Sequence, residues 1–221
     1  MPVDPDAPIE VTAFRWVPEL ARGQVRDLRV RWALEEAGLS YRTRLIGGAI
    51  GGERPAEYYE EQPWGQVPVY KEGDLVLFEC GAIVLHIAEK SEALLPADPN
   101  GRARAIAWLF AALNSMDIPV MGTLVACIFG EGKDWSAGAG EAFGGFLDQR
   151  LARLSAWLGD KEWLEGRFTV GDLMMVATLR IGVARERLPE NLAAYVARGE
   201  ARPAFKAALS AQFADFSEEP A

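Results

Sequence analysis

The first part of the chain alternates between strand-like and helix-like runs of apolar residues. Ile9–Phe14 alternates apolar with polar side chains, which is typical of a half-buried strand. Residues 25–37 follow with apolar side chains at helical spacing, and Gly38 stands where a glycine commonly stops a helix. Tyr41–Ile46 returns to strand-forming residues. The pattern predicts a strand–helix–strand unit, whose helix crosses over between two parallel strands.

A second unit of strand, turn, strand and helix comes next. Residues 67–70 and 75–78 are rich in strand formers, and residues 71–74 between them have the composition of a tight turn, which predicts an antiparallel hairpin. Residues 82–90 then predict a helix, and residues 54–62 predict a short helix before the hairpin. The simplest arrangement places the strands of both segments in one mixed sheet.

Two features of this second unit suggest a ligand site. Val67-Pro68 opens the hairpin, and a cis bond there would present backbone groups to a ligand instead of a neighbouring strand. After the hairpin, residues 79–81 turn a strand directly into a helix. Such a corner leaves backbone N–H groups free, and these groups attract carboxylates.

The chain after residue 90 predicts helices only. Residues 91–100 contain prolines and predict a linker, and residues 130–145 are rich in glycine and polar residues and predict a mobile loop. Thr169 and Asp172 have the spacing of a capping box at a helix start. Pro119 is expected to kink or restart a helix. The predicted helices are residues 102–116, 120–129, 146–158, 190–198 and 203–213, besides the one that starts at Thr169.

Composition and charge narrow the class of protein. The chain has 221 residues and a formal net charge of -9, which argues against nucleic acid or an anionic membrane as a partner. Five arginines near the start could still form a local basic pocket: Arg15, Arg22, Arg26, Arg29 and Arg31. No apolar run approaches the roughly 20 residues of a membrane-spanning helix, and the acidic, proline-containing N-terminus is unlike a secretory signal.

The cysteines and the histidine do not by themselves indicate a catalytic or metal site. The chain has only two cysteines, Cys80 and Cys127, so a disulfide framework is not expected and a cytoplasmic location is the default. His86 is the one histidine and sits among apolar neighbours in a predicted helix. No set of Cys, His, Asp and Glu has metal-ligand spacing, so neither a metal nor another cofactor is expected.

The hairpin unit resembles the glutathione-binding domain of glutathione S-transferases of the cytosolic, bacterial-like type. The resemblance rests on Gly65-Gln66-Val67-Pro68 before the hairpin and on Glu79-Cys80-Gly81-Ala82-Ile83 after it. It implies an α/β thioredoxin-like domain followed by an all-α helical domain, the glutathione S-transferase fold. The expected divisions are a disordered lead-in at 1–8, the first domain at 9–90, a linker at 91–100, the helical domain at 101–213 and a flexible tail at 214–221.

The resemblance also implies how glutathione would bind. The backbone of Val67, before Pro68, would pair with the cysteinyl part, and Gln66 would lie near the glycyl end. Glu79 and Cys80 would hold the γ-glutamyl end. Cys80 stands where the family usually has Ser, and a thiol is a weaker hydrogen-bond donor than a hydroxyl. A thiol at a helix start could also be a nucleophile, but the resemblance puts this corner away from the reacting sulfur.

The catalytic residue is not identified. The family places Tyr, Ser or Cys just after the first strand, whereas residues 15–24 contain none of these and no Thr. Counting from the strand points to Trp16 or Val17, and counting back from the helix points to Gln24. Arg22 could stabilise a thiolate electrostatically or could simply face solvent. Asn114, on the first helix of the second domain, is a further pocket candidate.

The expected function is therefore conjugation of glutathione thiolate to a small electrophile by a homodimer. Glutathione would be a co-substrate and not a cofactor. One alternative is a glutathione-binding or protein-interaction relative with little transferase activity, since a fold does not by itself define a function. Another is glutathione-dependent isomerase, dehalogenase or reductase chemistry at the same binding site.

Overall fold

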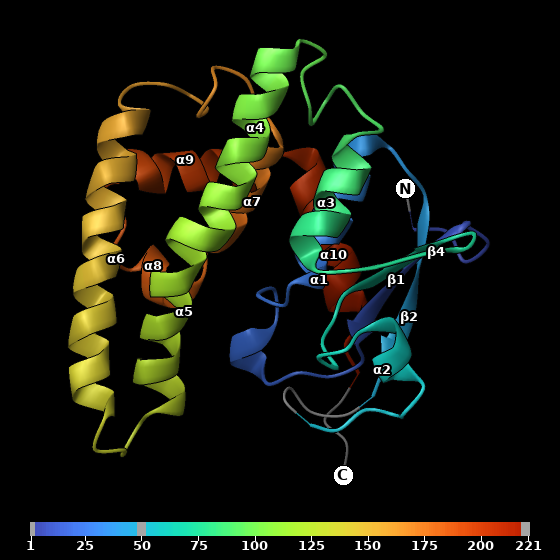
Figure 1. Cartoon of the computed structure of the whole chain (residues 1–221), viewed down its shortest axis with the longest axis horizontal. Helices are drawn as coiled ribbons and strands as arrows, with labels where there is room; N and C mark the ends of the chain where they lie inside the picture. The colour runs from blue at the N-terminus through green and yellow to red at the C-terminus, as the bar shows by residue number, and fades with distance from the viewer. Residues whose placement is uncertain (1–2, 48–51, 218–221) are drawn as a thin grey trace. The chain divides into compact units, whose positions relative to one another are not determined.

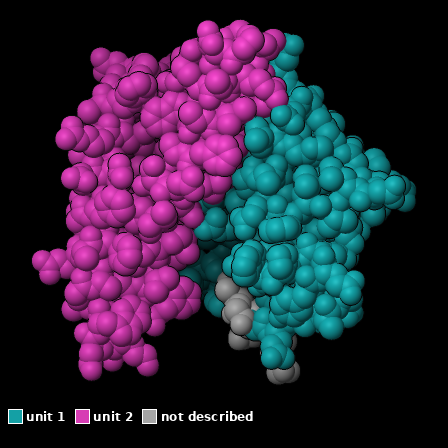
Figure 2. All heavy atoms as spheres, in the orientation of Figure 1, with its two compact units in different colours: residues 1–94, 202–221 teal, residues 95–201 magenta. Residues whose placement is uncertain are grey.

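The chain folds into two compact units. The computed structural model describes residues 3–47 and 52–217 (Figure 1). The first unit comprises residues 1–94 together with 202–221, and the second comprises residues 95–201 (Figure 2). Residues 48–51, within the glycine-rich stretch 47–52, lie outside the described residues.

A four-stranded mixed sheet forms the centre of the first unit. Its strands are β1 (Ile9–Phe14), β2 (Tyr41–Ile46), β3 (Val69–Glu72) and β4 (Leu75–Phe78), in the order β2-β1-β3-β4. β1 pairs with β2 in parallel, and the other two pairs are antiparallel. This arrangement confirms the predicted thioredoxin-like sheet. The hairpin turn is tighter than predicted, because β3 continues to Glu72 and only Gly73 and Asp74 connect it to β4.

Burial along the strands follows their place in the sheet. β1 is the inner strand between β2 and β3, and it is buried on both faces: Val11 and Ala13 are buried on one, Thr12 and Phe14 on the other. β4 is an edge strand and leaves Leu75, Val76 and Phe78 exposed. The central strand β1 is therefore buried on both faces, whereas the edge strand β4 exposes apolar side chains.

Five helical segments lie within the described residues of the first unit. They are the 3-10 turn η1 (Glu19–Ala21), α1 (Asp27–Ala37), α2 (Tyr58–Glu61), α3 (Cys80–Ala88) and α10 (Pro203–Asp215). α1 ends at Gly38, whose φ of 68° is the left-handed conformation expected of a glycine stop. α2 is shorter than predicted. α3 begins at Cys80, two residues earlier than predicted. Only Glu79 therefore connects β4 to α3, whereas the sequence predicted a connection of three residues.

The last helix belongs to the first compact unit, although the sequence assigned it to the helical domain. α10 lies beside α1 (Figure 1). The rings of Trp32 and Phe205 meet edge to face with centroids 4.9 Å apart. Buried Arg31 donates to Asp27 at 2.8 Å and to Asp215 at 2.6 Å. These contacts join positions far apart in the chain, which sequence periodicity cannot detect.

The predicted flexible tail begins too early. Asp215 is the last residue of α10 and pairs with Arg31, so it is held in place by a charge that lies almost wholly buried. The backbone N–H of Ser217 donates to the carbonyl of Arg15 at 2.9 Å. Residues 214–217 are thus ordered by the first unit.

The second unit is helical in its described residues, as predicted. Its elements are α4 (Pro99–Ala111), the π-helical turn η2 (Ala112–Met116), α5 (Asp117–Leu124), the π-helical turn η3 (Val125–Phe129), α6 (Ser136–Leu158), α7 (Val170–Leu179), α8 (Gly182–Arg185) and α9 (Glu190–Glu200). The short α8 was not predicted. α5 and α6 pack side by side (Figure 1).

Two predictions for this unit are corrected. Pro119 lies in the first turn of α5 just after η2, where a missing N–H is tolerated, so the helical run continues past it. The segment 130–145 is not a loop throughout, because α6 already begins at Ser136. Tertiary packing outweighs the cost of about 1 kcal/mol per helical glycine: α6 buries one stripe of leucines, namely Leu147, Leu151, Leu154 and Leu158.

The helical stretch Pro99–Phe129 is more apolar than we expected from the sequence. It contains an 18-residue window of mean hydropathy 1.5, which by length and composition alone could cross a membrane. Core helices of soluble proteins pass the same test, and 39% of this window is buried in the structure. The expectation that no run approaches the length of a membrane span is therefore wrong as a statement about composition.

The start of α7 confirms the predicted capping box. Asp172 accepts hydrogen bonds from the backbone N–H of Thr169 and of Leu164, both at 2.9 Å. The hydroxyl of Tyr195 donates to the same carboxylate at 2.9 Å. Thr169 in turn accepts from the N–H of Gly171 at 3.2 Å. Burial raises the pKa of Asp172 despite these donors.

Candidate functional site

A small pocket of the first unit gathers the residues that the hairpin motifs single out. It has a volume of about 20 Å³. Its lining includes all five predicted glutathione-binding residues, which are Gln66, Val67, Pro68, Glu79 and Cys80. Gln62 completes it and was not predicted, together with Arg26, which the sequence indicated only as one of five arginines that could form a basic pocket. The two motifs are separated by the hairpin in sequence, and the fold of β3 onto β4 brings them to one place.

The Val67-Pro68 segment lies just outside the sheet ladder. The bond between the two residues is cis. β3 begins only at Val69, whose N–H donates to the hydroxyl of Thr12 at 2.7 Å. Thr12 is buried on the central strand β1, so the strand start next to the pocket is fixed to the middle of the sheet.

A set of polar side chains supports the same segment from the other side. The hydroxyl of Tyr58 donates to the carbonyl of Gln66 at 2.7 Å and lies 3.1 Å from the hydroxyl of Thr12. Burial raises the pKa of Tyr58, which keeps the phenol in its donating form. Buried Arg54 donates to the carbonyl of Gly65 at 3.0 Å and stacks over the ring of Phe14. These positioning residues are distant in sequence, and no local pattern identifies them.

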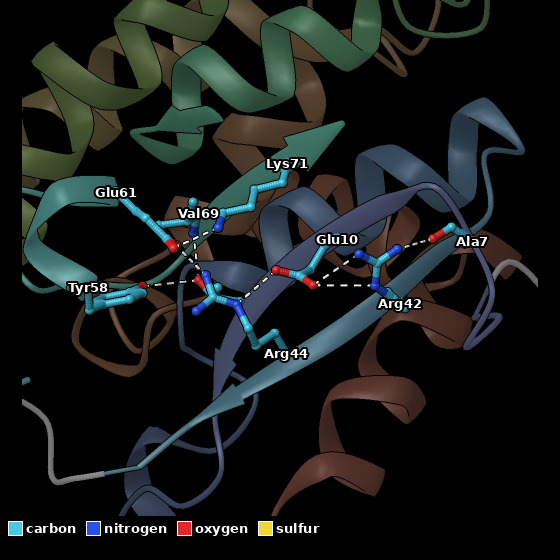
Figure 3. A network of polar contacts seen from close by, with 9 residues as sticks. Ala7, Glu10, Arg42, Arg44, Tyr58, Glu61, Val69 and Lys71 are labelled. Atoms are coloured by element: carbon cyan, nitrogen blue, oxygen red, sulfur yellow. Dashed lines mark hydrogen bonds and ion pairs between the residues drawn. The ribbon is translucent and has the colours of Figure 1, made fainter. Parts of the chain in front are cut away.

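Charged side chains tie α2 to the sheet beneath this segment. Figure 3 shows Arg44 of β2 between Glu10 of β1 and Glu61 of α2. Lys71 of β3 donates to the same Glu61 at 2.6 Å, and Arg42 pairs with Glu10 at 3.2 Å (Figure 3). Burial disfavours the ionised Glu61, but the hydrogen bonds from Lys71 and Arg44 outweigh it and lower the pKa of Glu61. The network holds α2, and with it Tyr58, in register with the strands.

A larger hollow next to this network is not where the motifs meet. It has a volume of about 390 Å³, and charged residues line much of it: Arg44, Glu53, Glu57 and Glu61. Arg44 and Glu61 are already paired with each other. Size alone would favour this hollow, but the chemistry of the motifs favours the small pocket.

The start of α3 forms the other wall of the small pocket. Glu79 precedes the helix with φ 68° and ψ 113°, a left-handed conformation that is uncommon for a residue other than glycine. Among the described residues no side chain caps this helix start. The first N–H groups of a helix have no acceptor within the helix, so Cys80 and Gly81 begin α3 with N–H groups that suit an anion.

Two arginines of the α1 region approach the thiol of Cys80. The thiol is buried, and the Nη1 atoms of Arg26 and Arg29 each lie 4.0 Å from its sulfur. Arg26 is half-buried and lines the pocket, whereas Arg29 is buried. The corner between β4 and α3 is therefore more positive than the hairpin motifs alone suggested. The cluster of arginines in the sequence was the available signal.

None of the loop residues proposed for catalysis lines the pocket. Val17 is fully buried in the core, and Trp16 is half-buried. The guanidinium of Arg22 lies over the ring of Phe216, 5.6 Å from its centroid. The side-chain oxygen of Gln24 has no hydrogen-bond partner among the described residues. The structure thus brings no hydroxyl or thiol of this loop to the pocket, because the loop contains none.

Asn114 is exposed on η2 of the second unit, and its predicted role stays a prediction. Within residues 3–47 and 52–217, no group of three or more His, Cys, Asp or Glu side chains is arranged to hold a metal ion.

Comparison with known proteins gives a consistent result. Residues 20–89 match the family model described as "Glutathione S-transferase, N-terminal domain". Glutathione S-transferase GstB of Escherichia coli K12 is 30% identical over 150 residues, which are 66% of this chain and 72% of that protein. Glutathione S-transferase 4 of maize is 34% identical over 105 residues, and the match spans only 46% of each chain.

A solved structure extends the likeness to nearly the whole chain. The theta class glutathione S-transferase from Xanthomonas axonopodis pv. citri, determined with glutathione bound, superimposes with a TM-score of 0.74 at 27% identity. The superposition covers 92% of this chain and 97% of that one. The likeness therefore includes the helical second unit as well as the sheet.

Proposed function

Because this chain belongs to the glutathione S-transferase family, we propose that it binds glutathione against the residues that line the small pocket and conjugates the glutathione thiolate to an electrophile. The observation that carries the proposal is the pocket itself. It unites Gln66, Val67, Pro68, Glu79 and Cys80 within the segment that matches the family's N-terminal domain. The glutathione bound to the related Xanthomonas structure supports the choice of ligand.

The chemistry of each wall suits one part of the tripeptide. The N–H groups at the start of α3 take the γ-glutamyl carboxylate, and the carboxylate of Glu79 takes the γ-glutamyl ammonium group. The backbone of Val67 takes the cysteinyl part through main-chain hydrogen bonds. Gln66 takes the glycyl end. Thr12 and Tyr58 hold the segment that carries Gln66 and Val67.

The group that activates the glutathione sulfur is not a hydroxyl or thiol of residues 15–24, because that loop contains none. A thiolate is stabilised by nearby N–H groups and positive charge. The N–H groups of Arg22 and Gln24 already donate to the carbonyls of Glu19 and Ala21, and no activating residue is assigned. Arg22 itself is held over Phe216, which supports a structural role for its side chain.

The alternative is a relative that binds glutathione without efficient conjugation, and the absence of Tyr, Ser, Thr and Cys from residues 15–24 favours it. Glutathione affinity by calorimetry, measured together with conjugation of 1-chloro-2,4-dinitrobenzene, separates the two. Binding with turnover supports the transferase. Binding without turnover of several electrophiles supports the alternative, and absence of binding overturns both. Isomerase, dehalogenase or reductase activity would need the same glutathione affinity with a different second substrate.

Homodimerisation through the β4 edge is also proposed. Leu75, Val76 and Phe78 leave about two fifths of each side chain exposed on one edge strand, at 38%, 43% and 40%. An exposed apolar edge is a template for pairing with a second copy. Light scattering should give a dimer, and Val76→Lys should shift it to a monomer, whereas Lys at exposed Leu20 should not. A monomeric wild type would contradict this.

The cytoplasmic location stays a proposal, supported by the two free cysteines.

A further inference from the structure

The γ-glutamyl corner of this chain lacks a donor that the family usually provides there. Cys80 occupies the position of the usual Ser, and its thiol is a weak donor to a carboxylate. The backbone N–H groups of α3 remain, but the side chain offers a bound carboxylate a weaker hydrogen bond than a hydroxyl would. A ligand held as proposed would need another side chain to compensate for the difference.

Arg26 is the side chain that the structure brings to this corner. It lines the same pocket as Glu79 and Cys80, and its Nη1 atom lies 4.0 Å from the sulfur of Cys80. It stands immediately before α1, so its backbone is fixed by the helix that packs against α3. A carboxylate bound at the start of α3 would lie within reach of this guanidinium.

We infer that Arg26 is a specificity-determining residue that binds the α-carboxylate of the γ-glutamyl group in place of the missing hydroxyl. The inference rests on the proposed glutathione site. Arg26 and Glu79 then form the two charged poles of the pocket, one for the carboxylate and one for the ammonium group. Such a pair selects a zwitterionic amino-acid end and disfavours thiols that lack either charge. Arg29 does not line the pocket and contributes through its positive charge.

Ligand analogues make the inference testable. The probes are glutathione and 4-aminobutyryl-cysteinyl-glycine, which differs only by lacking the γ-glutamyl α-carboxylate. A charge-assisted hydrogen bond of this kind predicts that Arg26→Gln weakens glutathione binding about 10- to 100-fold. Binding of the analogue to Arg26→Gln should stay within about twofold of wild type, because the analogue has no carboxylate for Arg26 to bind.

Two further variants separate binding from folding. Arg26→Lys keeps the charge and should lose less affinity than Arg26→Gln. Cys80→Ser in the Arg26→Gln background should restore part of the affinity for glutathione, because the hydroxyl returns the lost donor. Lys206→Gln removes an exposed cation of the same unit and should change neither affinity. Thermal unfolding of each variant checks that it is folded.

The outcomes are distinct. If wild type binds glutathione and Arg26→Gln weakens both probes equally, Arg26 acts on the fold of the site, and the inference is wrong while the proposed function stands. If Arg26→Gln binds glutathione as wild type does, the inference is likewise wrong. If wild type binds neither probe, the proposed function fails together with the inference.

Discussion

The starts of α3 and α7 are two helix N-termini that the chain treats in opposite ways. At α7, Thr169 and Asp172 satisfy the free N–H groups with their own side chains, and Tyr195 closes the carboxylate off from solvent. At α3, Glu79 adopts a left-handed conformation, and among the described residues no side chain caps the helix. The first arrangement stabilises a core helix, whereas the second leaves the first N–H groups of α3 without a side-chain acceptor among the described residues.

The contrast shows why a polar residue before an apolar run does not by itself indicate a site. The α7 start is buried, with Thr169 and Asp172 fully inside the second unit. The α3 start faces a pocket in which Arg26 supplies positive charge. Satisfied donors within a core indicate stability, and unsatisfied donors beside a pocket indicate binding.

The largest expected effect is on the α7 start. Asp172→Ala leaves the N–H groups of Leu164 and Thr169 and the hydroxyl of Tyr195 buried without their acceptor. The free energy of unfolding should fall by about 3–5 kcal/mol, as for other buried charged acceptors. Urea unfolding measures it. Asp148→Ala, which removes an exposed ion pair with Arg187, should change it by less than about 0.5 kcal/mol. If Asp172→Ala lowers the free energy of unfolding no more than Asp148→Ala does, the stabilising role of the α7 start is contradicted.

At the α3 start, stability and binding should separate. Glu79→Gly relieves the left-handed conformation, so the free energy of unfolding should be unchanged or higher by about 1 kcal/mol. The same change removes the proposed partner of the ligand ammonium group and should weaken glutathione binding about 3- to 10-fold. Urea unfolding and calorimetry on one preparation test both halves. Glu79→Gln, which keeps the strain, is the control and should not gain stability.

Cys80→Ser should have a smaller effect of the opposite sign on binding. The hydroxyl is a stronger donor than the thiol, so glutathione affinity should rise about 3-fold, which is below 1 kcal/mol. Calorimetry measures the affinity, and conjugation rates at saturating glutathione should not fall. Loss of conjugation in this variant would instead make the thiol a participant in the reaction.

The smallest effect is expected at the ion pairs outside both helix starts. Since Lys71 and Arg44 lower the pKa of Glu61 below its unfolded value of 4.5, these pairs contribute stability above about pH 4.5 and lose it as pH falls further. The contribution should be below about 1 kcal/mol because the pairs are partly exposed. Urea unfolding at pH 6 and pH 4 should show a smaller pH dependence for Glu61→Gln than for wild type. An equal dependence would assign the acid sensitivity to other carboxylates.

The sequence predicts local elements better than it predicts their partners. β1 and β2 have their predicted bounds, because alternation of apolar and polar side chains is a local signal. The capping box is equally local, since Thr169 and Asp172 are three residues apart. The predicted start of α6 was too late because the glycines near its beginning disfavour a helix, and tertiary contacts with α5 and η3 stabilise it.

The residues of the candidate site likewise differ in whether the sequence could predict them. Val67, Pro68, Glu79 and Cys80 could be found because their spacing resembles a known family. Thr12 and Tyr58 could not, because they support the pocket through contacts across the sheet. Arg26 was indicated only as one of a cluster of arginines, and its contact with Cys80 depends on the packing of α1 against α3. The group that activates the sulfur is absent from the usual position, and residues 15–24 offer no replacement side chain in the pocket.

The place of α10 has a consequence for how the first unit folds. Arg31 and Trp32 of α1 are fully buried, and their partners Asp215 and Phe205 lie far along the chain on α10. Asp27 still pairs with Arg31 when α10 is absent, but the second carboxylate and the ring that covers Trp32 are then missing. The first unit is therefore completed by a segment that follows the second unit in sequence. A fragment ending at residue 94 should therefore fold poorly, and a fusion of residues 1–94 to 202–221 is the better starting point for an isolated glutathione-binding unit.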